Sequence, residues 1–130
     1  MPHSFSLRVY YEDTDLAGIV YYANYLKFIE RARSEWVREI GVDQVALKAE
    51  QGIVFAVRRV EADYLAPAKF DDMLEVKTDV QDITAARITL TQDVSRGEDT
   101  LFKSVVTLVC LGPDGRPQRL PADIRQLMQR

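Results

Sequence analysis

One long amphipathic helix, followed only by strands, is the feature that most restricts how this chain can fold. From about Tyr22 to Ile40, apolar residues recur every three or four positions and charged residues fill the other faces. The apolar stripe holds Tyr25, Phe28, Ile29, Ala32, Trp36 and Ile40. This period predicts a helix of about five turns, and Gly41 fits the position just after its end. A stripe of this width must be covered by the sheet that the later strands form.

Alternation with a period of two replaces the helical period after Gly52 and predicts strands. Ser6–Tyr11 is predicted as an earlier strand, and the nearly continuous apolar run Leu101–Leu111 predicts a central strand buried on both faces. The other predicted strands span residues 54–65, 74–80 and 88–94. Short helices over Val42–Gln51 and after Pro121, and turns at Ser95–Asp99 and Gly112–Gly115, complete the prediction.

The order of these elements predicts an α+β fold rather than an α/β one. The late strands are joined by short connections without crossover helices, so we expect an antiparallel sheet. The 130 residues fit a single domain spanning residues 1–130. A sheet wrapped around one helix leaves an open edge strand, which is a hazard unless it is paired. We therefore expect dimerisation through the sheet.

Composition narrows the class of protein. The chain has 17 Lys and Arg against 20 Asp and Glu, a net charge of −3, which argues against a nucleic-acid partner. The single cysteine, Cys110, cannot form an intramolecular disulfide. We see neither the apolar segment of a signal peptide nor a run approaching the roughly 20 residues of a membrane span. These features predict a cytoplasmic protein without a membrane span.

A cluster of carboxylates, Glu12, Asp13 and Asp15, lies between the first strand and the helix in the stretch YYEDTDLAGIVYYANY. A solvated turn is one interpretation, because such residues are common where strands end. A calcium loop is a second, but Ala17 and Asn24 stand where oxygen ligands are needed. An aspartate-based phosphatase is a third, but it requires a parallel sheet with alternating helices, which this order of elements does not provide.

The fourth interpretation is a catalytic carboxylate at the start of the helix. A helix N-terminus offers unpaired N–H groups and about half a positive charge, which can hold a developing oxyanion. The N–H groups near Val20–Tyr22 would bind a carbonyl beside Asp15, and Gly18 would let the backbone approach the ligand closely. The single histidine, His3, lies near the terminus, so no Ser-His-Asp set is formed. This arrangement suits acyl transfer.

The stretch VYYEDTDLAGIVYYANY, followed by FIERARSEW, resembles the 4-hydroxybenzoyl-CoA thioesterase family of hotdog-fold acyl-CoA thioesterases. It is most similar to the bacterial branch associated with the Tol-Pal system, and YLAPAKFDDMLEV and RLPADIR extend the resemblance over nearly the whole chain. The resemblance implies a hotdog fold, with one long helix wrapped by an antiparallel sheet of about five strands, in a homodimer or homotetramer. It implies hydrolysis of a short-chain or aromatic acyl-CoA to the free acid and CoA, with no metal and no cofactor besides the CoA of the substrate.

The resemblance also implies roles for individual residues. Asp15 would be the catalytic carboxylate, acting either as nucleophile or as the general base that activates water. The backbone N–H near Tyr22 would polarise the thioester carbonyl, and Gly18, Val20 and Tyr25 would help to bind the substrate in a pocket between two protomers. Many members of the Tol-Pal-associated branch have His where this chain has Tyr22. The choice between short aliphatic and aromatic acyl groups therefore stays open.

Cations are needed for the phosphates of CoA. Arg58 and Arg59 are the substrate-binding candidates, because one of two successive strand residues should face inward or an interface; each could also serve solubility alone. Further candidates are Lys69, Arg87 and Lys103. Two other functions remain open at this point. One is a non-catalytic acyl-CoA-binding or scaffold module of a cell-envelope assembly, with Tol-Pal-associated proteins as partners, and the other is a different hotdog enzyme such as a hydratase.

Overall fold

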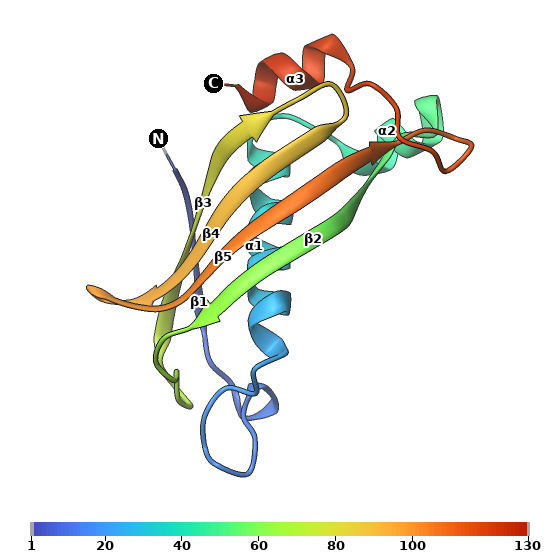
Figure 1. Cartoon of the computed structure of the whole chain (residues 1–130). Helices are drawn as coiled ribbons and strands as arrows, with labels where there is room; N and C mark the ends of the chain where they lie inside the picture. The colour runs from blue at the N-terminus through green and yellow to red at the C-terminus, as the bar shows by residue number, and fades with distance from the viewer. Residues whose placement is uncertain (1, 130) are drawn as a thin grey trace.

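A computed structural model describes residues 2–129 and holds one sheet wrapped around a long helix (Figure 1). The strands and helices, in chain order, are β1 (His3–Arg8), a 3₁₀ turn (Tyr11–Asp13), α1 (Asn24–Glu39), α2 (Gln44–Gln51), β2 (Val54–Tyr64), β3 (Met73–Ile83), β4 (Arg87–Arg96), β5 (Asp99–Leu111) and α3 (Ala122–Met128). One helix thus follows the first strand, and the four remaining strands come after α2. This is the order that the sequence predicts.

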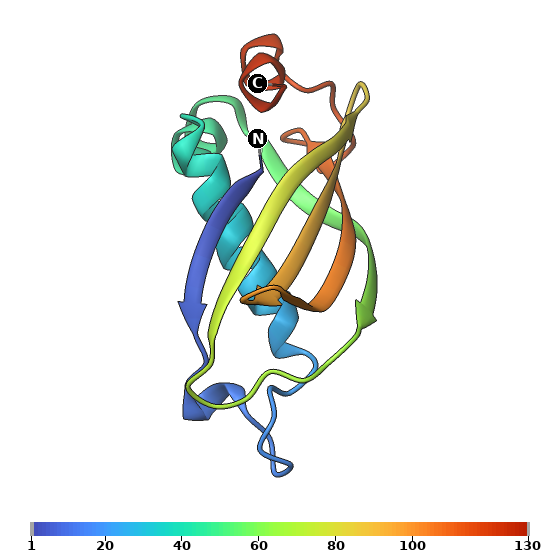
Figure 2. The same ribbon diagram turned by 90° about the vertical axis from the view of Figure 1, so that its left-hand side faces the viewer.

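The sheet has five strands in the order β1-β3-β4-β5-β2, and every neighbouring pair is antiparallel. Tight hairpins join β3 to β4 and β4 to β5, and Gly97 adopts a positive φ of 61° in the second of these turns. Figure 2 shows the sheet curving around α1, from β1 on one side to β2 on the other. The predicted α+β class and the hotdog architecture are confirmed.

Helix α1 packs its apolar stripe against β1, β3 and β4. Tyr25, Phe28, Ile29, Ala32 and Trp36 are all buried, as predicted, whereas Ile40 is only partly buried just beyond the end of the helix. Gly41 adopts a positive φ of 98°, which confirms its place after the helix. With 16 residues α1 is the longest helix. Within residues 2–129, none of the helices has the length and apolar character needed to cross a membrane.

The prediction that β5 is central and buried on both faces is wrong. β4 is the central strand, and β5 lies between β4 and the edge strand β2. Along β5, Val106 and Leu108 are buried beneath the helix, while Val105 and Thr107 on the outward face remain partly exposed. The reason is that helices cover only one face of the sheet in a single chain.

Two predicted boundaries near the N-terminus are also wrong. β1 spans His3–Arg8 rather than Ser6–Tyr11, because the chain turns at Tyr11–Asp13 instead of continuing as a strand. Helix α1 begins at Asn24 rather than Tyr22, with Ala23 as its N-cap. The residues that precede the helix are held instead by contacts with the 3₁₀ turn, which shape the candidate site.

A buried amide joins α1 to the centre of the sheet. Gln92 on β4 is fully buried, and its amide nitrogen donates to the Ile29 carbonyl and the Thr78 hydroxyl, both at 2.8 Å. Its amide oxygen accepts a hydrogen bond from Arg33 at 2.9 Å. Burial lowers the pKa of the Arg33 guanidinium, although the nearby Glu30 carboxylate opposes that shift. The helix is thereby held at one register on the sheet by polar as well as apolar contacts.

Replacing Gln92 with Leu removes all three of these bonds and leaves buried polar groups unpaired. We expect the free energy of unfolding to fall by about 1–3 kcal/mol, the usual cost of unsatisfied buried groups. Urea denaturation measures this loss. The matched control is Gln126→Leu on the exposed side of α3, which should change stability by less than about 0.5 kcal/mol. Equal stability of the two variants would contradict the role of Gln92.

Candidate active site

The loop that carries Asp15 is a small hairpin between the 3₁₀ turn and α1, at the end of the molecule opposite α3 (Figure 1). Thr14 pairs with Val20 across the hairpin, and the Asp15 amide donates to the Ile19 carbonyl at 2.9 Å. The Gly18 amide donates to the Asp15 carbonyl at 3.0 Å, and Gly18 has a φ of 80°, which side chains disfavour. Gly18 therefore closes the turn that presents Asp15.

The side chain of Asp15 is exposed in the single chain. One carboxylate oxygen accepts a hydrogen bond from the Ala17 amide at 2.9 Å, and no other hydrogen bond or ion pair engages the group within residues 2–129. A carboxylate has about four acceptor positions, so most of its capacity is free for a water or a substrate. Leu16, next to it, is fully exposed as well.

Asp13 has the opposite environment and a structural role. It is 7% exposed, and its carboxylate accepts a hydrogen bond from the Tyr10 amide at 2.8 Å. Its carbonyl accepts from the Tyr21 amide and from the Asn24 side chain, both at 2.9 Å. Asp13 thus ties the 3₁₀ turn to the start of α1, while Glu12 is exposed. Among the residues described, no group of three or more His, Cys, Asp or Glu side chains is placed to hold a metal ion.

Two adjacent backbone amides remain free where α1 begins. The Val20 amide donates to the Ala68 carbonyl at 2.8 Å, and the Tyr21 amide is taken by Asp13. Of the three backbone amides of Val20–Tyr22 that the sequence suggested for carbonyl binding, only the amide of Tyr22 has no acceptor within residues 2–129. Within residues 2–129, neither the Tyr22 amide nor the following Ala23 amide has a hydrogen-bond acceptor. Both are therefore available to an oxyanion in the positive field of the helix N-terminus.

The loop between β2 and β3 supports the hairpin from the side. Lys69 pairs with Ile19 in an isolated bridge, and Ala68 lies fully buried next to it. Asp72 fixes this loop by accepting hydrogen bonds from the Lys69 amide at 2.8 Å and from Arg96 at 2.7 Å. Burial alone would raise the pKa of Asp72, but these donors outweigh it and lower the pKa. The hairpin is thus supported by a loop that the hydrogen bonds of Asp72 hold in place.

Tyr25 lies in the core rather than on the surface of the site. It is 3% exposed, and its ring stacks on Phe102 at a centroid distance of 5.0 Å. Its hydroxyl accepts a hydrogen bond from the Ala68 amide at 3.1 Å, and burial raises its pKa. Tyr22, by contrast, is 61% exposed, and its ring lies near those of Tyr21 and Tyr64. Of the predicted aromatic residues, Tyr22 is the one that a substrate can reach in the single chain.

Arg58 and Arg59 lie in the middle of β2, away from the Asp15 hairpin in the single chain. A β-bulge falls between Val57 and Arg59, and both arginines are exposed. Arg59 forms an ion pair with Glu61 at 2.9 Å, whereas Arg58 forms no ion pair within residues 2–129. The structure therefore brings Asp15, Gly18 and Tyr22 together in one segment but leaves the two arginines apart from them.

The inward face of β2 is not covered by α1. Val57, Val60 and Tyr64 lie on the helix side of the sheet, opposite the buried residues of β5, yet they are 49%, 38% and 47% exposed. A cleft of about 230 Å³ separates β2 from α1, and Arg33 lines its helical wall. The edge strand β2 therefore has both an exposed apolar inward face and an edge that pairs with no other strand within residues 2–129.

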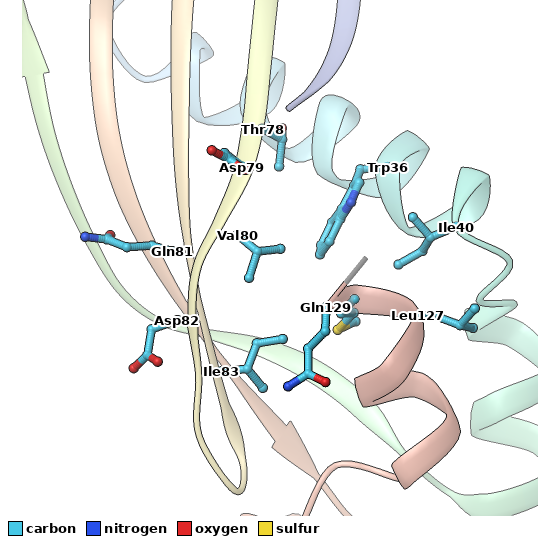
Figure 3. A pocket seen from close by; sticks show the side chains of 11 residues that line it. Trp36, Ile40, Thr78, Asp79, Val80, Gln81, Asp82, Ile83, Leu127 and Gln129 are labelled. Atoms are coloured by element: carbon cyan, nitrogen blue, oxygen red, sulfur yellow. The ribbon is translucent and has the colours of Figure 1, made fainter. Parts of the chain in front are cut away.

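A second cavity, of about 340 Å³, lies at the other end of the molecule between β3, α1 and α3 (Figure 3). Trp36, Val80 and Ile83 point into it, whereas the side chains of Asp79 and Asp82 point away. No acid or base among the labelled residues faces this space. The Asp15 hairpin, which presents an exposed carboxylate, is therefore the better candidate for chemistry.

Sequence reasoning missed two groups near the site, the Ala23 amide and the Tyr64 hydroxyl. Tyr64 ends β2, and its hydroxyl donates to the Tyr22 carbonyl at 3.0 Å. The strand alternation placed Tyr64 in a predicted strand without a role in the site, although it opens the stretch YLAPAKFDDMLEV. That motif was the one signal that could have directed attention to it.

The wrapped helix, with an exposed carboxylate and free amides at its start, defines a hotdog-fold thioester hydrolase. Residues 17–103 match the Thioesterase superfamily, and the chain belongs to that family. The chain is 42% identical over 120 residues to the acyl-CoA thioester hydrolase YbgC of Escherichia coli O6:H1, covering 91% of this chain and 89% of that protein. The predictions of the family and of a thioester hydrolase are confirmed.

Solved structures agree with this assignment. A probable thioesterase from Bartonella henselae is 36% identical, has a TM-score of 0.89, and is matched over 93% of this chain and 100% of its own. A mutant of 4-hydroxybenzoyl CoA thioesterase complexed with 4-hydroxybenzoyl CoA is 25% identical, with a TM-score of 0.91 and 98% of each chain covered. Both cover nearly all of the chain, so the likeness extends beyond the residues that match the superfamily.

Replacing Asp13 with Ala tests its structural role. The Tyr10 amide would lose the carboxylate acceptor of a part-buried hydrogen bond, so we expect the free energy of unfolding to fall by about 1–3 kcal/mol. Glu12→Ala, at the exposed neighbouring position, should change it by less than about 0.5 kcal/mol. Chemical denaturation of both variants measures the difference. A fully stable Asp13→Ala variant would argue that the 3₁₀ turn is held by other contacts.

Proposed function

We propose that this protein hydrolyses an acyl-CoA thioester to a free acid and CoA, with Asp15 as its catalytic carboxylate. The observation that carries the proposal is the exposed Asp15 carboxylate in the loop that leads to the free amides of Tyr22 and Ala23. The relatives named as acyl-CoA thioester hydrolases support a CoA thioester as the substrate. The acyl group is short or aromatic, and no cofactor is needed besides the CoA of the substrate.

The free amides bind the thioester carbonyl oxygen, where negative charge develops during attack. The positive end of α1 adds to this stabilisation. Asp15 then acts in one of two ways. As a nucleophile it attacks the carbonyl carbon and expels the CoA thiolate, and water hydrolyses the resulting anhydride. As a general base it takes a proton from the water that attacks the same carbon.

Substrate contacts come from residues with different environments. Tyr22 contributes its amide and its exposed ring, Gly18 shapes the loop, and the buried side chains of Val20 and Tyr25 form the wall behind it. Arg58 and Arg59 bind the phosphates of CoA. Arg58 is the stronger candidate, because Arg59 is already paired with Glu61.

The active protein is a homodimer or homotetramer in which two chains pair along β2. The unpaired edge of β2 and its exposed inward face, with Val57 and Val60, support this arrangement. Pairing would cover that face, and the acyl pocket would lie between two protomers. The proposed cytoplasmic location follows from the sequence features described above, and the proposed Tol-Pal-associated partners follow from the sequence resemblance.

Asp15→Asn keeps the shape of the side chain but removes its basicity. We expect wild-type protein to release thiol from short or aromatic acyl-CoAs, and the variant to lose at least about 10²-fold in rate, the scale of a lost acid–base group. Asp79→Asn, at an exposed position on β3, is the matched control and should keep the wild-type rate. A panel of short, aromatic and long acyl-CoAs with a thiol reagent gives the readout.

Full activity in Asp15→Asn would remove Asp15 from its catalytic role. Failure of the wild-type protein to release thiol from any substrate of the panel would overturn the enzymatic proposal and favour a binding module.

Val60→Lys tests the assembly. The residue is 38% exposed in a single chain, so a lysine is tolerated there, but it would place a charge in the interface between two β2 strands. We expect light scattering to give a wild-type mass of at least two 14.9 kDa chains, and a shift toward the single chain in the variant. Val45→Lys on exposed α2 serves as the control and should not dissociate. A monomeric wild-type protein would exclude a site shared by two protomers.

A further inference from the structure

The hydroxyl of Tyr64 links the edge strand to the start of α1. Tyr64 is the last residue of β2, and its hydroxyl donates a hydrogen bond to the Tyr22 carbonyl at 3.0 Å. That carbonyl belongs to the peptide group whose N–H is the free amide of Ala23. A side chain 42 positions along the chain thus acts on the backbone that forms the proposed oxyanion site.

The two free amides belong to peptide groups that are held in different ways. The amide of Tyr22 lies in the peptide group whose carbonyl, on Tyr21, accepts from the Asn24 amide at 2.8 Å. The helix therefore holds that group. The next carbonyl, on Tyr22, receives the Tyr25 amide only at 3.4 Å, so the 3.0 Å bond from Tyr64 is its shorter contact. The orientation of the Tyr22–Ala23 peptide depends mainly on Tyr64.

A hydrogen bond to a carbonyl also polarises its peptide group and makes the N–H on the other side a better donor. A tyrosine hydroxyl is protonated near neutral pH, so the Tyr64 hydroxyl is available as a donor. Burial raises its pKa further, and Tyr22 and Tyr25 add to the shift.

The ring of Tyr64 is fixed by three aromatic neighbours. Its centroid lies 5.1 Å from that of Phe102, 5.5 Å from Tyr25 and 6.1 Å from Tyr22, each in an edge-to-face arrangement. A donor held by packing in this way needs no rearrangement when charge develops on the substrate, which is the requirement for electrostatic preorganisation.

We propose that Tyr64 is a positioning residue for thioester hydrolysis, whose hydroxyl orients and polarises the Tyr22–Ala23 peptide group toward the thioester carbonyl oxygen. This role rests on the proposed function of the Asp15 site. Tyr64 acts through the backbone, so it stabilises the developing oxyanion without itself forming or breaking a bond. Removing the Tyr64 hydroxyl should weaken the Ala23 amide as a hydrogen-bond donor, but the amide itself would remain.

Tyr64→Phe removes the hydroxyl and keeps the ring. We expect kcat to fall about 3- to 30-fold, less than the 10²–10³-fold loss of a complete oxyanion donor. KM should stay within about twofold, because the contact acts mainly in the transition state. Tyr10→Phe, which alters an exposed tyrosine outside the site, should leave both constants unchanged.

A spectroscopic readout separates positioning from simple structural support. Acyl-CoA with a ¹³C-labelled thioester carbonyl is bound to the slow Asp15→Asn variant, and the carbonyl stretch is recorded by isotope-edited infrared spectroscopy. The bound carbonyl should absorb at a lower frequency than in water, because the amides polarise it. Adding Tyr64→Phe to Asp15→Asn should move the band back toward its frequency in water.

An unchanged kcat and an unshifted carbonyl band in Tyr64→Phe would overturn the role of Tyr64, even if Asp15→Asn is inactive as proposed. A fall in kcat with an unshifted band and an altered molecular mass would assign Tyr64 to assembly instead, and would also overturn it. Full activity in Asp15→Asn would refute the proposed function itself, so the two failures are distinguishable.

Discussion

The structure depends on how far one helix can cover a five-stranded sheet. Helix α1 packs mainly on β1, β3 and β4, and its apolar stripe is buried there. The edge strand β2 is left with an uncovered inward face and an unpaired edge. This incomplete coverage leaves a cleft beside the later turns of the helix. It also leaves the open face and edge of β2 on which the proposed interface depends.

Asp13 and Asp15 lie two positions apart in the chain, but the structure places their carboxylates in different environments. Asp13 turns inward and its carboxylate accepts a hydrogen bond from the Tyr10 amide, which makes it part of the structure. Asp15 turns outward on the hairpin and keeps most of its acceptor positions free. Asp13 therefore holds the segment that leads into α1, whereas Asp15 is available for chemistry.

The start of α1 and the end of β2 meet at the proposed site, and each contributes hydrogen-bonding groups to it. The helix contributes two unpaired amides, and the strand contributes Tyr64, whose hydroxyl reaches the Tyr22 carbonyl. Aromatic packing around Tyr25 and Phe102 holds that contact in position. The site is therefore supported from behind by the core, while its front is open to a substrate or to a partner chain.

The sequence by itself determined the elements and the position of Asp15, because periodicity, glycine turns and the order of helix and strands are local properties. The helical stripe, the α+β class and the carboxylate just before the helix could all be read from neighbouring residues. Only the tertiary structure decided which amides are free. Val20 is paired with Ala68 and Tyr21 with Asp13, and these bonds remove two of the three expected donors. It also exposed one face of β5 and brought Tyr64 to Tyr22. Such contacts join residues far apart in the chain, or depend on which face of the sheet a helix covers, and no local pattern encodes them.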